Sequence, residues 1–111
     1  MKPRALAWIA AVTGGSLQGA DAWVGAVATD TRALPLQGQP LFVALKGENF
    51  DGHAHAQAAA NGGCVAAMVA RPVDVNIAQI IVPNTERALA DLAAAVQRER
   101  STKVLAVTGS N

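Results

Sequence analysis

Two polar segments of the sequence combine residue types that could bind an anionic, hydrogen-bond-rich ligand. The first is "TDTR" at 29–32 and the second is "KGENFDGH" at 46–53. Arg32 offers a planar fork of donors and Lys46 a flexible cation, and proteins use both groups to hold phosphate. The hydroxyl of Thr31 adds a further hydrogen-bonding group. Together the two segments predict a site for a phosphorylated ligand.

The second segment also has the backbone features of an anion-binding turn. Gly47 and Gly52 allow close approach of the main chain, and Asn49 or Asp51 can cap the helix expected to follow. Free N–H groups at such a helix start attract negative charge. His53 completes the turn. Composition alone nevertheless favours a plainer interpretation, in which both segments are ordinary polar loops with helix caps.

Parallel strands are predicted to position these segments. Short apolar runs indicate strands at 26–29, 41–45, 64–70, 78–82 and 103–107. Most of these runs are continuously apolar, which is typical of strands covered on both faces. An alanine-rich helix between the second and third runs makes a βαβ unit, whose crossover should be right-handed. The sequence therefore predicts an α/β fold with a mixed, mostly parallel sheet flanked by helices.

Two further helices are predicted, one before this unit and one after it. The first covers about 3–13 and ends at Gly14. The second runs over about 85–98, and its apolar stripe consists of Leu89, Leu92 and Val96. Pro83 breaks the pattern between the last paired strand and this second helix, so a domain boundary is predicted there.

The end of the sequence indicates the start of a second domain. "KVLAVTGSN" at 103–111 is typical of a strand that leads into a glycine-containing phosphate loop, which normally continues with a second glycine, a lysine and a hydroxyl residue. We therefore predict one domain over 1–82. Residues 83–111 would supply the first helix and strand of a second domain, with the sequence stopping inside the loop.

The overall composition excludes several classes of partner. A formal charge of +1 gives no reason to expect nucleic acid or an anionic membrane, and few aromatic residues are present to stack on bases. No run is long enough to span a membrane. Cys64 is the only cysteine, so an intrachain disulfide is excluded and a reducing cytoplasm fits. The basic and apolar N-terminus also allows a signal peptide, although a short amphipathic helix is the simpler interpretation.

Several single residues are expected to be structural. His53 and His55 are two positions apart and would point to different faces of a helix, which disfavours a metal site. Cys64 is expected to be buried at the start of a strand. Arg71 follows that strand and, like Lys2, is expected to lie outside the ligand crevice.

The order of the motifs resembles the N-terminal domain of the Mur ligases, which build the peptidoglycan stem peptide. Asp30-Thr31-Arg32 matches the family's Asp, Ser or Thr, Arg triplet, and the strand Leu41 to Leu45 follows it. Lys46-Gly47-Glu48 and Phe50-Asp51-Gly52-His53 match the turn after that strand. The early "GGSLQGAD" and the closing "VLAVTGSN" extend the resemblance over nearly the whole chain. Ala54-His55 departs from the family's usual Asp and aromatic pair, so no contact is assigned there.

The resemblance implies that the chain anchors a substrate. The N-terminal domain of this family binds the UDP part of UDP-MurNAc-tripeptide, which implies substrate contacts from Thr31, Arg32, Lys46, Gly47, Asn49, Asp51, Gly52 and His53. The family's central domain binds ATP, and the matching half of its loop is Thr108, Gly109, Ser110 and Asn111. ATP and Mg²⁺ would serve the complete ligase. No catalytic residue or metal ligand is expected within this chain, which alone should be inactive.

The reaction implied is ATP-dependent amide formation, through an acyl phosphate, between UDP-MurNAc-tripeptide and D-alanyl-D-alanine. The segment "ALKGENFDGH" favours the family member that adds D-alanyl-D-alanine over the neighbouring member that adds the third stem residue. A free-standing UDP-sugar-binding module is the alternative from another functional class. The resemblance also implies a cytoplasmic protein, and a monomer is expected.

Overall fold

The computed structural model describes the backbone of residues 3–29, 38–46 and 51–108, and the side chains of this part of the chain up to Glu99. Its main sheet consists of β2 (Ser16–Gln18), β4 (Ala26–Ala28), β5 (Pro40–Val43), β6 (Ala66–Val69) and β7 (Ala78–Ile81). The strand order is β2-β7-β6-β5-β4. The strands from β4 to β7 are parallel to one another and β2 is antiparallel to β7. The predicted α/β fold with a mixed, mostly parallel sheet is confirmed.

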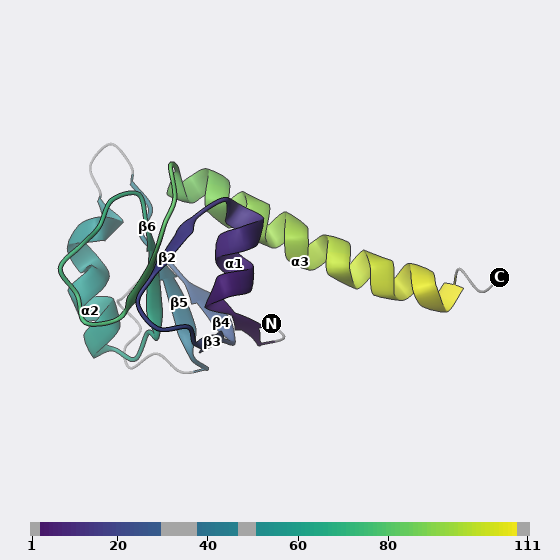
Figure 1. Cartoon of the computed structure of the whole chain (residues 1–111), viewed down its shortest axis with the longest axis horizontal. Coiled ribbons are helices and arrows are strands. Elements are labelled where there is room, and N and C mark those ends of the chain that lie inside the picture. The colour runs from purple at the N-terminus through teal and green to yellow at the C-terminus, as the bar shows by residue number, and fades with distance from the viewer. Residues whose placement is uncertain (1–2, 30–37, 47–50, 109–111) are drawn as a thin grey trace.

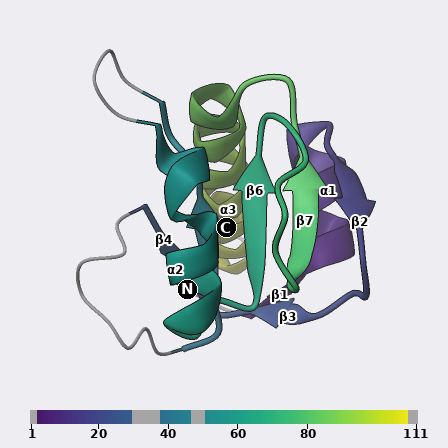
Figure 2. The ribbon, with the colours of Figure 1, turned by 90° about the vertical axis from the view of Figure 1, so that its left-hand side faces the viewer.

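Helices cover both faces of this sheet. Figures 1 and 2 show α1 (Leu6–Thr13) and α3 (Thr85–Thr108) on one face and α2 (Ala56–Asn61) on the other. A short 3-10 helix, η1 (Gly52–His55), leads directly into α2. The chain thus passes from β5 through η1 and α2 to the parallel strand β6, which is the predicted βαβ unit.

Side chains along β5 show how the sheet is buried on both sides. Leu41 and Val43 belong to the core shared with α1 and α3, whereas Phe42 and Ala44 belong to the core under α2. All four are at most 1% exposed. Because successive side chains of a strand point to opposite faces, a continuous apolar run is what a doubly covered strand requires.

The N-terminal helix is shorter than predicted, because Arg4–Ala5 forms a strand instead of a first helical turn. This strand, β1, pairs antiparallel with β3 (Trp23–Val24) in a separate two-stranded sheet. Within α1, Leu6 and Ile9 are fully buried. The helix ends at Gly14, whose φ of 68° lies in the left-handed region that glycine adopts without strain.

Arg4 joins this N-terminal strand to the long helix α3. Its guanidinium forms an ion pair with Glu99 and lies over the ring of Trp8, 4.7 Å from the ring centroid. The arginine side chain is only 9% exposed. This ion pair therefore links the N-terminal strand to the later turns of α3 beside the core.

The last predicted strand, at 103–107, is wrong, because α3 continues through Thr108. Leu92 and Ala88 anchor the first turns of this helix in the core, and Figure 1 shows its later turns extending away from the sheet. A strand needs a neighbouring strand for its backbone hydrogen bonds, and no strand lies beside 103–107 among the described residues. Gly109, Ser110 and Asn111 lie outside the described residues. The boundary near Pro83 stays a prediction.

No helix within the described ranges is both long and apolar enough to cross a membrane.

Candidate functional site

The two polar segments start from neighbouring strands of the sheet. β4 and β5 are parallel, and Ala28 pairs with Phe42 near their carboxyl ends. The chain therefore leaves both strands at the same edge, which is where open α/β sheets bind ligands. Thr31 and Arg32 follow β4 but lie outside the described residues, as do Gly47 and Asn49 after β5.

The two ends of the second segment are held together by the backbone. Lys46 and Asp51 form an isolated antiparallel bridge, and the amide of Gly52 donates to the carbonyl oxygen of Leu45 at 2.6 Å. A Cβ at Gly52 would lie 2.8 Å from the backbone N and O of Leu45 and 2.9 Å from the Cα of Ala44. Only glycine fits this close approach, as the sequence suggested for this position.

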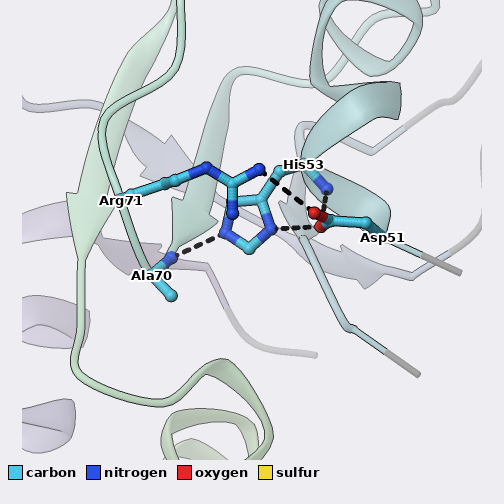
Figure 3. Close-up of polar contacts among 4 residues, drawn as sticks. All are labelled: Asp51, His53, Ala70 and Arg71. Atoms are coloured by element: carbon cyan, nitrogen blue, oxygen red, sulfur yellow. Dashed lines mark hydrogen bonds and ion pairs between the residues drawn. The ribbon is translucent and has the colours of Figure 1, made fainter. Parts of the chain in front are cut away.

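Asp51 is the centre of a polar cluster at the end of this segment (Figure 3). Its Oδ1 accepts from the backbone N–H of His53 at 3.0 Å, which caps η1, and lies 2.6 Å from Nδ1 of the same residue. Its Oδ2 accepts from Nη2 of Arg71 at 3.1 Å. The hydrogen bonds from the His53 ring and backbone, followed by the one from Arg71, hold the pKa of Asp51 well below its ordinary range. Asp51 is therefore a capping carboxylate, as predicted.

The ring of His53 is committed to bonds within the protein. Its side chain is 2% exposed, and its Nε2 accepts from the backbone N–H of Ala70 at 2.9 Å. Because Nε2 is an acceptor, the proton of the neutral ring sits on Nδ1 and is donated to Asp51. Both ring nitrogens are used, so a metal or a ligand could reach this ring only by breaking one of these bonds.

A cavity of about 350 Å³ opens beside this cluster, between the ends of β5 and β6 and the start of α3. Its lining includes Lys46, His53, Arg71, Asn84, Thr85 and Glu86. Lys46 and Arg71 contribute positive charge and Glu86 negative charge. Asn84 caps α3, since its side-chain oxygen accepts from the backbone N–H of Arg87 at 2.9 Å.

The expectation that Arg71 lies outside the crevice is wrong. Arg71 lines the cavity together with Lys46 and is bonded to Asp51. The signal was present in the sequence, because Arg71 directly follows a predicted parallel strand, and the carboxyl ends of adjacent parallel strands share one edge. Cys64 is buried as predicted, two residues before β6 begins, and this burial raises the pKa of its thiol.

Comparisons with known proteins agree with this architecture, although no family model matches the chain. The chain is 47% identical over 102 residues to UDP-N-acetylmuramoyl-tripeptide–D-alanyl-D-alanine ligase of Escherichia coli (strain K12), covering 90% of this chain and 22% of the relative. It is 40% identical over 73 residues to UDP-N-acetylmuramoyl-L-alanyl-D-glutamate–2,6-diaminopimelate ligase of Bacillus licheniformis, covering 64% of this chain and 15% of that relative.

A solved structure shows the same fold. Crystal structure II of MurF from Acinetobacter baumannii superimposes with a TM-score of 0.81 at 32% identity, covering 91% of this chain and 22% of that protein. The chain thus spans about a fifth of the length of the Escherichia coli ligase and of the Acinetobacter baumannii protein. From its sequence and its fold together, the chain belongs to the Mur ligase family and corresponds to the N-terminal part of a MurF-type ligase.

Proposed function

We propose that this chain anchors the UDP end of UDP-MurNAc-tripeptide in a ligase that joins D-alanyl-D-alanine to that substrate. The observation that supports the proposal is the parallel pairing of β4 with β5, because the chain leaves both strands at the same edge of the sheet. The relative that covers 90% of this chain is named for the same substrate and the same dipeptide.

Five residues of the two segments contact the ligand in this proposal. Thr31 hydrogen-bonds the uracil or the ribose, while Arg32 and Lys46 neutralise the diphosphate. Backbone N–H groups around Gly47 and Asn49 complete the anion cradle. Lys46 is exposed and lines the cavity, so its ammonium group is available to a ligand from solvent.

The buried part of the cluster supports the binding segment. Asp51, Gly52 and His53 shape its end through the contacts described above. Anchoring the nucleotide far from the reacting carboxylate would help to position that carboxylate, because binding energy from remote parts of a substrate can be used for orientation.

The complete ligase would draw on ATP and Mg²⁺, which supply the phosphoryl group that activates the substrate carboxylate when they are bound. The first half of the ATP loop would be Thr108, Gly109, Ser110 and Asn111. Thr108 is helical in this structure, so a loop of that kind would require the last turn of α3 to change conformation. We further propose that the ligase acts in the cytoplasm and as a monomer.

The anchoring role is tested by titrating UDP and UDP-MurNAc-tripeptide into the ¹⁵N-labelled chain and following its amide resonances. Shifts should cluster at 29–32, 46–53 and the neighbouring Ala70 and Arg71. Cytidine diphosphate serves as the matched control, because it keeps the diphosphate and changes only the base. Shifts confined to other surfaces, or an absence of binding, would contradict the proposal.

A second candidate is the ligase that adds the third stem residue, since a diaminopimelate ligase is 40% identical over 64% of this chain. The two are separated by assaying the protein encoded by the whole gene with each pair of substrates. Amide formation from UDP-MurNAc-tripeptide and D-alanyl-D-alanine supports the first proposal. Formation of product only from UDP-MurNAc-dipeptide and diaminopimelate supports the second. UDP-sugar binding with neither activity indicates a free-standing binding module.

A further inference from the structure

Arg71 lies outside both predicted binding segments, yet it is bonded to the end of one of them. Its Nη2 donates to Oδ2 of Asp51 at 3.1 Å, across a separation of 20 residues in the sequence. We propose that Arg71 is a positioning residue for nucleotide binding, which acts through Asp51 on Lys46, Gly52 and His53 rather than on the ligand. The inference rests on the proposed function, because it concerns the same ligand.

The contacts around Asp51 explain how Arg71 can have this effect. Asp51 forms the backbone bridge with Lys46 that closes the segment, and its side chain holds the start of η1 through His53. Ala70 and Arg71, at the end of β6, contact Asp51 and His53 from the other side. The amide of Ala70 donates to His53, and the guanidinium of Arg71 donates to Asp51. Figure 3 shows the four residues as one connected cluster. The end of the binding segment is therefore fixed to a core strand of the sheet.

Arg71 is the member of the cluster that can be changed with the least effect on the fold. Its side chain is 56% exposed, whereas that of His53 is 2% exposed. Exposed ion pairs contribute little to the stability of a folded protein. A ligand that binds only one arrangement of a segment is weakened in proportion to the fraction of molecules that have it. Loss of Arg71 should accordingly appear in ligand affinity more than in unfolding.

Direct contact between Arg71 and the diphosphate is the competing explanation, since Arg71 also lines the cavity. A double-mutant cycle separates the two. If Arg71 acts through Asp51, Asp51→Asn already removes the interaction that Arg71→Ala removes, so the double variant binds as weakly as Asp51→Asn alone. If Arg71 touches the ligand, removing it from the Asp51→Asn variant weakens binding further.

The test measures UDP binding to the 111-residue chain by calorimetry, with Arg87→Ala as the matched control. Arg87 carries the same charge, but its side chain is 81% exposed and faces Asp91 on α3. Arg71→Ala should weaken binding about threefold to fivefold, as expected for losing one exposed ion pair. Arg71→Lys should restore part of the loss, Arg87→Ala should bind normally, and both alanine variants should unfold at the same denaturant concentration.

The outcomes are distinct for the inference and for the proposed function. If the unsubstituted chain does not bind UDP, the proposed function itself is contradicted. Normal UDP binding by Arg71→Ala, or additive losses in the cycle, would overturn the positioning role while leaving the anchor in place. The amide resonances of Gly52 and His53 should shift in free Arg71→Ala, and unchanged resonances there would also overturn the positioning role.

Discussion

The backbone amide of Ala70 donates to Nε2 of His53 at 2.9 Å, so the end of β6 selects the tautomer of a buried imidazole in η1, which follows the neighbouring strand β5. The Nδ1–H of the same ring donates a hydrogen bond to Oδ1 of Asp51. One histidine thus joins the segment after β5 to the end of β6. Long-range ¹H–¹⁵N spectra of the ring should show a protonated Nδ1 and an unprotonated Nε2 at neutral pH.

Replacing His53 with alanine should destabilise the fold by about 1–3 kcal/mol, because the buried imidazole is lost together with its hydrogen bonds to Asp51 and to the amide of Ala70. Denaturant unfolding followed by circular dichroism measures the change. Gln57→Ala is the control, since Gln57 is exposed and its side-chain amide donates to Oδ1 of Asn61 on the same helix at 3.0 Å. Equal stability of the two variants would show that the Ala70 contact contributes nothing.

Asp51 should make the protein sensitive to acid. Its pKa is lower in the folded chain than the ordinary value of 3.8, so the folded state binds this proton less readily than the unfolded state. The contribution of ionised Asp51 to the stability of the folded state is therefore fully present above about pH 4 and is lost as the pH falls further. Unfolding measured across this range should change less steeply for Asp51→Asn. Identical pH profiles for the two proteins would contradict the assignment.

Gly52→Ala should cost stability and ligand binding together. The new Cβ would meet the backbone of Leu45 and Ala44 at less than 3.0 Å, which forces the segment to move. Overpacking of this kind costs about 1–3 kcal/mol. Gly14→Ala is a useful comparison, because Gly14 has a positive φ but open space around it and lies at the end of α1. Both variants should be less stable, and only Gly52→Ala should lose affinity for UDP.

Arg32→Ala and Lys46→Ala should each weaken binding of UDP-MurNAc-tripeptide by about 1–3 kcal/mol, as expected for a charge-assisted hydrogen bond to the diphosphate. Isothermal titration of each purified variant measures the loss. Uridine should bind both variants as it binds the original chain, because it lacks the diphosphate. A loss of the same size for uridine would assign these two side chains to the base or the sugar instead.

Cys64 should react slowly with a thiol reagent until the protein unfolds. It is 4% exposed, and its burial raises the pKa of the thiol, so little thiolate is present at neutral pH. Absorbance during reaction with an aromatic disulfide should rise only when denaturant is added. Rapid reaction of the folded chain would contradict the burial of this residue.

The sequence predicted the parallel strands because their physical requirement is local. A strand covered on both faces needs a continuous apolar run, and the run at 41–45 has one. The segment Ser16–Gln18 gave no such signal, since it is short and polar and is a strand only by pairing with β7. The strand predicted at 103–107 is wrong for the converse reason: Leu and Ala are good helix formers, and no strand lies alongside this run in the described structure.

The sequence predicted those features of the candidate site that follow from the order of residues within a motif. It missed the contacts that depend on how distant segments pack together. Gly52 and Asp51 have the roles expected of a close approach and a helix cap. The link from Arg71 to Asp51 joins residues 20 positions apart, and their meeting follows from the adjacency of β5 and β6. The burial of His53 likewise depends on where β6 ends, and periodicity within the segment carries no information about that.

The ion pair between Arg4 and Glu99 sets an order of events during biosynthesis. Its partners are separated by 95 residues, so this ion pair can form only when nearly the whole of this chain has emerged from the ribosome, whereas β1 can pair with β3 earlier. Contacts of such sequence separation form late, because a long loop must close before they can stabilise anything. A nascent chain halted before Glu99 would leave Arg4 without its ion-pair partner. Chaperones that bind surfaces not yet packed would therefore have access to the N-terminal end of this protein for longer than to its middle.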